Sequence, residues 1–209
     1  MAADKSRATE FVRTLESDTA DYDVELSAQD CERLAAYYTL LESWNPRLHL
    51  VAPCSPQEFA RRHVLESLLL TRYLTNDARV ADIGSGAGLP IIPCLIVRSD
   101  IKATLIESSK KKAVFLREAL NHTETNQSAT VIGKRFEEVS SLGMEFITCR
   151  ALDRFISQLP TMIEWAPQGS TLLLFGGNEL QKHIERLNLR YSSLPIPFSK
   201  SRLLLKVGI

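Results

Sequence analysis

The fold of this chain is decided by the stretch Asp82-Ile83-Gly84-Ser85-Gly86-Ala87-Gly88, which lies between a predicted strand and a predicted helix. Its glycines let the backbone turn sharply and let a ligand lie against peptide groups that carry no side chain. A nucleotide-like cofactor suits such a loop, and the alternative is a tight turn that binds nothing. NAD is disfavoured, because the dinucleotide pattern Gly-x-Gly-x-x-Gly would need a glycine where this chain has Leu89.

Around this loop, short β-like segments alternate with helical ones. The alternation is typical of β-α-β units and predicts an α/β, Rossmann-like fold with a mostly parallel, seven-stranded sheet. The expected strands are Val80–Ile83, Ala103–Ile106, Ala129–Ile132, Phe146–Cys149, Thr171–Phe175 and an antiparallel pair near Tyr191–Ile196 and Arg202–Val207. The helices between them are expected to begin near Pro90, Ser109, Phe136, Asp153 and Asn178.

The first 75 residues have a helical pattern instead. From Ser27 onward apolar residues recur at helical spacing, with Ser27 and Asp30 placed as a capping box. Asn45-Pro46 predicts a break, and a second helix is expected to open at Ser55-Pro56-Gln57-Glu58 and to continue to about Tyr73. We therefore expect an N-terminal helical cap, residues 1–75, on a single Rossmann-like domain, residues 76–209.

The composition favours a cytoplasmic protein without a membrane segment. The chain has 209 residues, 44% of them hydrophobic, enough to bury one core. Its apolar stretches are shorter than the roughly 20 residues that cross a bilayer, and the N-terminus shows no secretory signal. The four cysteines form no Cys-x-x-Cys pair and have no histidine at ligand spacing, so neither a metal site nor a disulfide framework is expected.

The net charge is zero, which by itself argues against a nucleic-acid partner. The charge is unevenly distributed, however. Residues 1–30 hold eight acidic and three basic side chains, so residues 31–209 carry a modest positive surplus. Within that part, Lys110-Lys111-Lys112 open a predicted helix, where the helix dipole prefers anions. A phosphate-rich partner is one explanation for the three lysines, and a solvated charged face is the other.

Two carboxylates are placed to contact a cofactor. Asp82, two residues before the first glycine, can hold an ammonium group or a water at a methionine-type cofactor but would repel a pyrophosphate. Glu107 ends the second strand, and in a doubly wound sheet that strand finishes beside the cofactor crevice. There a carboxylate can accept hydrogen bonds from both ribose hydroxyls. Otherwise Glu107 is simply an exposed acid at a strand end.

Several motifs together resemble one family, the 16S ribosomal RNA guanine-N7 methyltransferases, also called the RsmG or GidB family. The resemblance extends from about Trp44 to Lys206. The glycine loop alone specifies only a superfamily, whereas Arg-His-x-Leu-x-Ser before Gly-Ser-Gly-Ala-Gly-Leu-Pro is much more specific. The landmarks are Trp44-Asn45, Arg62-His63-Val64-Leu65-Glu66-Ser67, Asp82 to Pro90, Leu105-Ile106-Glu107-Ser108, Lys110 to Lys112, Phe115-Leu116-Arg117 and Cys149-Arg150-Ala151.

The resemblance implies an S-adenosylmethionine-dependent methyltransferase fold, with ribosomal RNA or the assembling small ribosomal subunit as partner. We expect a monomer. The resemblance implies cofactor contacts at Gly84, Leu89, Phe136, Glu137 and Arg150. These add to Asp82, Gly86 and Gly88 at the glycine loop and Glu107 at the end of the second strand. Arginine donors can recognise guanine O6. The candidates for contact with the methyl-accepting base, called acceptor candidates below, are therefore Arg150, Arg62 and, more weakly, His63 and Arg61. A structural ion pair for Arg150 and a packing role for His63 are the alternatives.

Four sites depart from the family pattern. His49 and Val51 stand where the family tends to have Asn and Thr, Ile91 replaces a glycine, and Gly176-Gly177 replace a Lys-Gly pair. The missing lysine matters most, because it removes a positive charge from the end of the predicted fifth strand, near the expected acceptor. A changed substrate or turnover is therefore open even if the cofactor still binds.

The implied reaction needs neither a base nor a nucleophile, because guanine N7 has a free lone pair at neutral pH. Most of the rate acceleration is expected to come from positioning a base that has been withdrawn from its stack. Cys149 is accordingly assigned to packing. The chain has no Asp/Asn-Pro-Pro-Tyr motif, which argues against methylation of an exocyclic amine.

Two alternatives stay open: a methyltransferase with another RNA, a protein or a small molecule as substrate, and a catalytically silent RNA-binding or ribosome-assembly factor. A dehydrogenase is the weakest interpretation.

Overall fold

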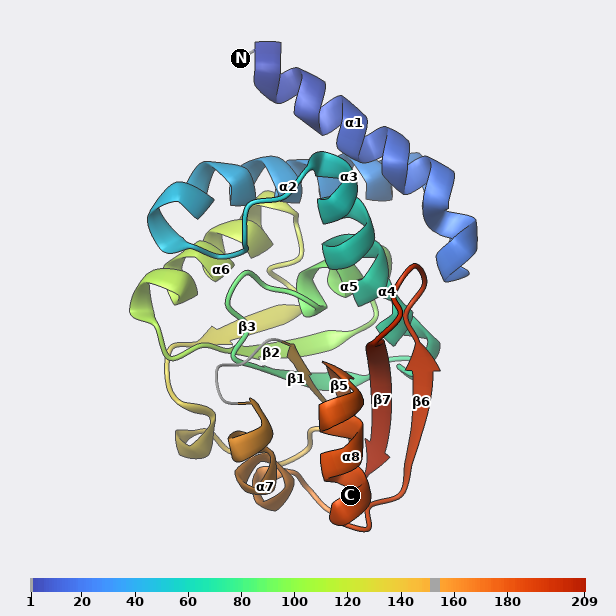
Figure 1. The fold of residues 1–209 in the computed structure, drawn as a ribbon. Helices are drawn as coiled ribbons and strands as arrows, with labels where there is room; N and C mark the ends of the chain where they lie inside the picture. Colours follow the sequence, from blue (N-terminus) through green and yellow to red (C-terminus); the bar gives the residue numbers. More distant parts are fainter. Residues whose placement is uncertain (1, 151–154) are drawn as a thin grey trace.

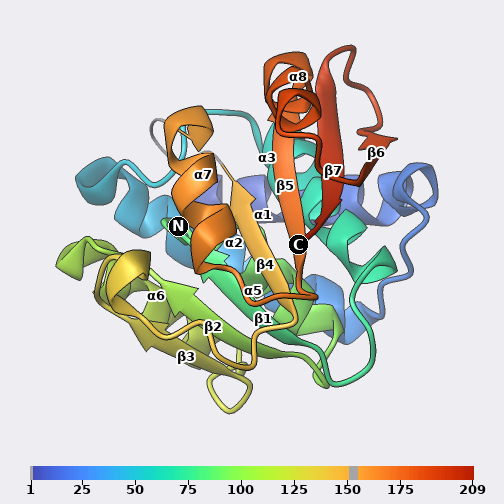
Figure 2. The same cartoon turned by 90° about the horizontal axis from the view of Figure 1, so that it is seen from below.

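A seven-stranded sheet forms the centre of the computed structural model, which describes residues 2–150 and 155–209. Its strand order is β3-β2-β1-β4-β5-β7-β6, with β7 antiparallel to both of its neighbours and the other pairs parallel (Figures 1 and 2). The predicted α/β fold with a mostly parallel, seven-stranded sheet is therefore confirmed. The strands are β1 (Arg79–Ile83), β2 (Lys102–Ile106), β3 (Ala129–Ile132), β4 (Phe146–Arg150), β5 (Thr171–Gly177), β6 (Tyr191–Pro195) and β7 (Arg202–Gly208).

The helices after β1 follow the expected order, with one correction. The segment at Phe136 forms only the 3-10 turn η4 (Phe136–Glu138), because the backbone is extended again at Val139. The expected helix start at Asp153, like the landmark residue Ala151, lies outside the described residues. The α-helices are α5 (Ile91–Val97), α6 (Lys110–His122), α7 (Phe155–Trp165) and α8 (Asn178–Arg186).

Alternate residues of the strands pack on opposite faces of the sheet. Val80 and Leu105 face the core under the N-terminal helices, α5 and α6, whereas Ala81 and Ile106 face the core under α7 and α8. Figure 1 shows the two groups of helices on opposite sides of the sheet. Because β1 lies between β2 and β4, the strand order reverses at β1. The carboxyl ends of β1 and β4 are thus the switch point where ligands bind in doubly wound sheets.

The N-terminal part begins with a helix that the sequence pattern did not single out, α1 (Ala2–Asp18), followed by the turn η1 (Thr19–Tyr22). The next helix, α2 (Ala28–Leu48), starts with the predicted capping box between Ser27 and Asp30. The predicted break at Asn45-Pro46 is wrong, since α2 continues through Pro46 to Leu48. A proline so close to a helix end removes little of the hydrogen-bond ladder.

The second predicted helix is capped as expected, with Ser55 Oγ accepting from the backbone N–H of Glu58 at 3.1 Å. It is not one regular helix. This composite helix consists of α3 (Pro56–Phe59), the π-helical turn η2 (Ala60–Leu65), α4 (Glu66–Leu68) and the 3-10 turn η3 (Leu69–Arg72). In the π turn the N–H of Glu66 donates to the carbonyl of Arg61, five residues back. Such turns are frequent at functional sites, and this one carries Arg62 and His63.

One apolar core joins the N-terminal helices to the sheet. It contains Phe11 and Leu15 of α1, Leu34 of α2 and Phe59 of α3 together with Val80 of β1. The division of the chain at residue 75 therefore remains a prediction. None of the described helices combines the length and the apolar character that crossing a bilayer requires.

Candidate active site

The glycine loop lies at the carboxyl end of β1 and is held against β2. The backbone N–H groups of Gly84 and Ser85 donate to the carbonyl of Ile106 at 2.9 and 3.2 Å. Gly88 has a φ of +84°, and a Cβ there would lie 2.3 Å from Cδ1 of Ile92. The loop therefore needs glycine at this position for its conformation and for its close approach to α5.

Glu107 holds the same loop from the end of β2. Its Oε2 accepts from the N–H of Gly86 at 2.9 Å, and its Oε1 accepts from the N–H of Ser109 at 2.7 Å. Glu107 thus fixes the loop and the start of α6 together. Because each carboxylate oxygen can accept more than one hydrogen bond, these contacts leave acceptor capacity for ribose hydroxyls.

Asp82 is fully buried beneath the loop. The hydroxyl of Thr148, opposite it on β4, donates to Asp82 Oδ1 at 2.7 Å. The other oxygen, Oδ2, is buried and has no hydrogen-bond partner within the described part of the chain. Burial raises the pKa of Asp82 to about 7, against the lowering effect of its hydrogen bonds. A buried acceptor of this kind suits an ammonium group or a water that arrives with a ligand.

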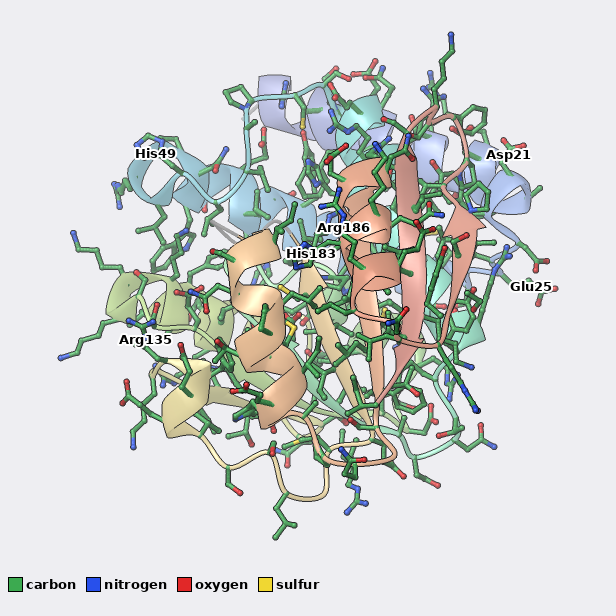
Figure 3. The ribbon with its side chains drawn as sticks, turned by 60° about the horizontal axis from the view of Figure 1, so that its bottom comes forward. Asp21, Glu25, His49, Arg135, His183 and Arg186 are labelled. Atoms are coloured by element: carbon green, nitrogen blue, oxygen red, sulfur yellow. The ribbon has the colours of Figure 1, made fainter. Side chains whose placement is uncertain are left out.

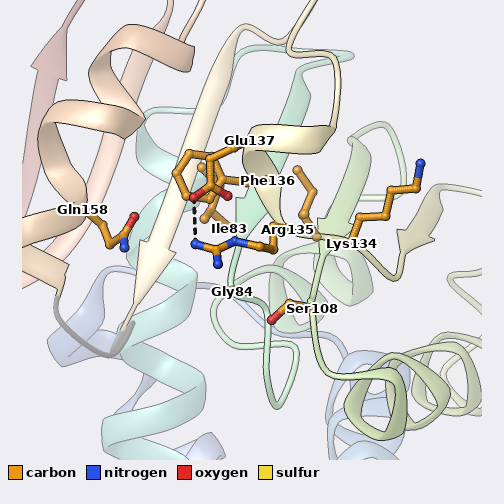
Figure 4. Close-up of a pocket in the computed structure, with 9 residues that line it drawn as sticks. Ile83, Gly84, Ser108, Lys134, Arg135, Phe136, Glu137 and Gln158 are labelled. Atoms are coloured by element: carbon orange, nitrogen blue, oxygen red, sulfur yellow. Dashed lines mark hydrogen bonds and ion pairs between the residues drawn. The ribbon is translucent and has the colours of Figure 1, made fainter.

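A groove of about 220 Å³ opens beside the loop, between β1, β2 and the segment after β3 (Figure 4). Of the predicted cofactor residues, Gly84, Phe136 and Glu137 line it. Phe136 is buried and meets Trp165 edge-on, with 5.8 Å between the ring centroids. Glu137 pairs with Arg135 at 3.1 Å, the dashed contact in Figure 4.

Other groove residues were missed by the sequence analysis, namely Lys134, Arg135 and Gln158. Lys134 and Arg135 directly follow β3, and this position could have identified them. Gln158 lies on α7, and no sequence signal places that helix beside the groove. The remaining loop residues Asp82, Gly86, Gly88 and Glu107 shape the loop without lining the groove. Leu89 is 7% exposed and packs in the core, which leaves its backbone for a ligand contact.

Arg150, predicted above both as a cofactor contact and as a contact to the acceptor base, lies at the carboxyl end of β4 among residues of the composite helix. It does not line the groove, so its contact with the cofactor remains a prediction. Its Nη1 donates to Ser67 Oγ at 3.3 Å, and its Nη2 donates to the Arg62 carbonyl and to Glu66 Oε2, the latter at 3.2 Å. The guanidinium also lies over the Phe175 ring, 5.2 Å from its centroid. The structural ion pair, which is the alternative role for Arg150, is therefore present. Glu66, its partner, was not recognised from the sequence.

The other acceptor candidates lie on the π turn but differ in environment. Arg62 and Arg61 are exposed and form ion pairs with Glu58 and Asp18. His63 is half-buried against Phe59, and burial together with nearby arginines lowers its pKa to about 3. His63 is therefore neutral at pH 7. It can accept or donate a hydrogen bond but carries no charge for a phosphate.

Two further positions bear on the acceptor side of the site. Cys149 is fully buried in the core under α7 and α8, as its assignment to packing implies. At Gly176, a Cβ would lie 2.4 Å from Cδ2 of Leu180, so a longer side chain there would require Leu180 to move.

The acidic N-terminal segment lies away from the groove. Figure 3 shows Asp21 and Glu25 on the opposite side of the molecule from Arg135, which lines the groove. These two acidic side chains therefore lie away from the groove.

Solved structures with a similar fold include methyltransferases. A SAM-dependent methyltransferase from Aquifex aeolicus gives a TM-score of 0.59 at 14% identity, over 72% of this chain and 92% of that one. A methyltransferase from Pyrococcus furiosus gives a TM-score of 0.59 at 13% identity, over 85% and 99%. At these identities the likeness shows the Rossmann-like methyltransferase fold and nothing about substrate.

The sequence comparisons are more specific. Residues 30–198 match the model of the GidB family, described as rRNA small subunit methyltransferase G. The chain is 37% identical over 153 residues to ribosomal RNA small subunit methyltransferase G of Xanthomonas axonopodis pv. citri, covering 73% of this chain and 71% of that protein. The protein of the same name from Paramagnetospirillum magneticum is 35% identical over 179 residues, covering 81% and 84%. The chain therefore belongs to the GidB family of small-subunit ribosomal RNA methyltransferases.

Proposed function

We propose that this protein transfers a methyl group from S-adenosylmethionine to N7 of a guanine in 16S ribosomal RNA. The observation that carries the proposal is the glycine loop at the switch point in a member of the GidB family, with an oxygen of Asp82 beneath the loop that has no hydrogen-bond partner among the described residues. The relatives named above are small-subunit ribosomal RNA methyltransferases, which supports the same class of substrate here.

The residues at the loop and groove fit this cofactor. Asp82 offers a buried acceptor for its ammonium group, and Glu107 has acceptor capacity for the ribose hydroxyls. Phe136 and Glu137 line the groove where an adenine ring needs an apolar face and a polar edge. When bound, S-adenosylmethionine supplies a methyl group made electrophilic by the sulfonium.

On the acceptor side, this chain has to orient a base rather than activate it. N7 of guanine already carries a lone pair, so no side chain needs to remove a proton. The site's contribution is alignment, worth several orders of magnitude when reacting atoms are held in line. Arg150, fixed at the end of β4, is the candidate donor to guanine O6, which would also disfavour adenine.

The partner we propose is ribosomal RNA, free or within the assembling small subunit, and the protein would act as a monomer in the cytoplasm where subunits assemble. The decisive experiment is to map 7-methylguanosine in ribosomal RNA from cells with and without this protein. Loss of one methylated guanine on deletion is expected. An unchanged map would remove the proposed substrate.

Calorimetry with S-adenosylmethionine separates the two remaining alternatives. Binding without a change in the ribosomal map would favour another RNA, a protein or a small molecule as acceptor. No binding at high cofactor concentration would favour a silent RNA-binding or assembly factor. RNA affinity should fall steeply with salt if phosphates are contacted.

The absence of a nucleophilic step can be tested at Cys149. This buried side chain packs in the core, so Cys149→Ala is expected to leave methyl transfer largely intact. The free energy of unfolding should fall by about 1 kcal/mol. If the variant binds cofactor normally but transfers no methyl group, a covalent mechanism would replace the N7 mechanism.

A further inference from the structure

A buried ion cluster lies where β4, β5 and β7 meet the composite helix. Arg150 ends β4, and Arg202 begins β7 directly opposite Gly177, which ends β5. Glu66 of α4 lies between the two arginines with 1% of its side chain exposed. Its Oε2 is 3.2 Å from Arg150 Nη2, and its Oε1 forms a close ion pair with Arg202 Nη1.

We propose that Glu66 is a positioning residue for methyl transfer, whose carboxylate holds the guanidinium groups of Arg150 and Arg202 in place at the acceptor side of the site. The inference rests on the proposed function, because Arg150 is the candidate contact to the acceptor guanine. It assigns a role to a residue that makes no contact with the groove itself.

Stability alone is a poor explanation for this cluster. Removing a charged group from water costs several kcal/mol, and apolar replacements of buried ion pairs are often equally stable or more stable. Here two guanidinium groups, 13% and 29% exposed, share one carboxylate. The cluster therefore carries a surplus positive charge. A surplus of this sign suits the carbonyl oxygen of guanine or an RNA phosphate.

The π turn explains how Arg150 is held in one orientation. In a regular α-helix the N–H of Glu66 would donate to the carbonyl of Arg62, four residues back. In η2 it donates to the carbonyl of Arg61 instead, and the Arg62 carbonyl accepts from Arg150 Nη2. The turn thus presents this carbonyl and, directly after it, the carboxylate of Glu66 to the same guanidinium. Ser67 Oγ adds a third contact from the next residue.

The test compares Glu66→Gln with a matched control, Glu42→Gln, in the full-length protein. Glu42 lies in α2 and also pairs with an arginine, Arg7, at 2.6 Å. Glu66→Gln should lower kcat/KM for small ribosomal subunits roughly 10- to 100-fold, because small displacements of a positioning group have effects of that size. Its calorimetric affinity for S-adenosylmethionine should stay within about twofold of wild type, and Glu42→Gln should change neither quantity.

A double-mutant cycle with Arg150→Gln separates positioning from general destabilisation. If Glu66 acts through Arg150, Glu66→Gln should have little further effect on kcat/KM in the Arg150→Gln background, whereas independent losses would add. Glu66→Asp, which keeps the charge, should recover part of the activity lost in Glu66→Gln. Thermal unfolding of each variant shows whether it is folded. If Glu66→Gln does not fold, Glu66→Asp takes its place: its shorter side chain should cause a smaller loss of kcat/KM, and that loss should likewise disappear in the Arg150→Gln background.

Two outcomes would overturn the inference: a folded Glu66→Gln variant as active as Glu42→Gln, or a loss of kcat/KM that adds fully to that of Arg150→Gln. A wild-type protein that methylates no guanine in the small subunit would instead overturn the proposed function. The two failures are therefore distinguishable in one set of assays.

Discussion

The proposed cofactor end and the proposed acceptor end of the site are built by different means. At the cofactor end, formed by β1, β2 and the glycine loop, most contacts have a main-chain group on at least one side: the N–H groups of Gly86 and Ser109 donate to the Glu107 carboxylate, and the loop N–H groups donate to the Ile106 carbonyl. At the acceptor end, formed by β4, β5, β7 and the composite helix, most contacts join one side chain to another, and Glu66 and Arg150 are 84 positions apart. The first end depends on space around the backbone and on one buried acid, Asp82, and the second depends on buried ion pairs.

The largest effect is expected where space is tightest, at Gly88. In Gly88→Val the Cβ would lie 2.3 Å from Ile92 Cδ1, at a φ of +84° that valine avoids. Overpacking and backbone strain together should lower the free energy of unfolding by about 2 to 5 kcal/mol. We expect calorimetry to show no cofactor binding. The measurements are urea unfolding and titration with S-adenosylmethionine.

Gly169→Val provides the control for that prediction. Gly169 has nearly the same φ, +81°, but a Cβ there would meet no atom within 4 Å. Gly169→Val should lower the free energy of unfolding by about 1 to 3 kcal/mol, through backbone strain alone, and leave cofactor affinity unchanged. Equal losses of cofactor affinity in the two variants would show that the cofactor end does not depend on local space.

A somewhat smaller effect is expected from the buried charge at the cofactor end. The pKa of Asp82 is raised to about 7, so between about pH 4 and pH 7 the folded protein keeps a proton that the unfolded chain releases. The free energy of unfolding should therefore fall as the pH rises through this range, by about 2 to 4 kcal/mol from this group. Asp82→Asn should remove that fall in urea unfolding without cofactor. An identical pH dependence in both proteins would contradict it.

At the acceptor end the pH dependence should have the opposite sign. The pKa of His63 is lowered to about 3, chiefly by burial and then by Arg150, Arg62 and Arg202. Between about pH 3 and pH 6.5 the unfolded chain binds a proton that the folded protein does not, so stability should rise with pH. The free energy of unfolding should rise by about 1 to 3 kcal/mol over this range, allowing for the partial exposure of His63. In urea unfolding, His63→Gln should remove this rise of the free energy of unfolding with pH. If His63→Gln and Asp82→Asn changed the pH dependence in the same direction, the predicted opposite signs would be wrong.

The cofactor end could be predicted from sequence because its residues are close in the chain. The glycine loop, the strand before it and the end of the next strand appear in order, and β1 and β2 begin one residue before their predicted starts. Gly84, Phe136 and Glu137 were named from motifs, and they line the groove. Their contacts with the cofactor remain predictions.

The acceptor end could not be predicted in the same way. Arg62, His63 and Arg150 were singled out, but Glu66 was only part of a motif, and Arg202 was only the start of a strand. Their meeting depends on the pairing of β7 with β5 and on the π turn, which no periodicity reveals. The position of Gln158 depends likewise on how α7 packs. Contacts between distant segments are set by packing, and one sequence does not show them.

The smallest expected effect lies at the point where the N-terminal helices contact the cofactor end. The hydroxyl of Tyr37, in α2, is fully buried and donates to the carbonyl of Ala87 in the glycine loop at 2.7 Å. Tyr37→Phe leaves that carbonyl without this donor, so stability should fall by about 1 kcal/mol and cofactor affinity by a few-fold. The neighbouring Tyr38→Phe is the control, because its hydroxyl contacts Glu42 at 3.5 Å, away from the loop. If the two variants bind S-adenosylmethionine equally well, α2 supports the fold without tuning the loop, and the cofactor end depends only on its own short stretch of chain.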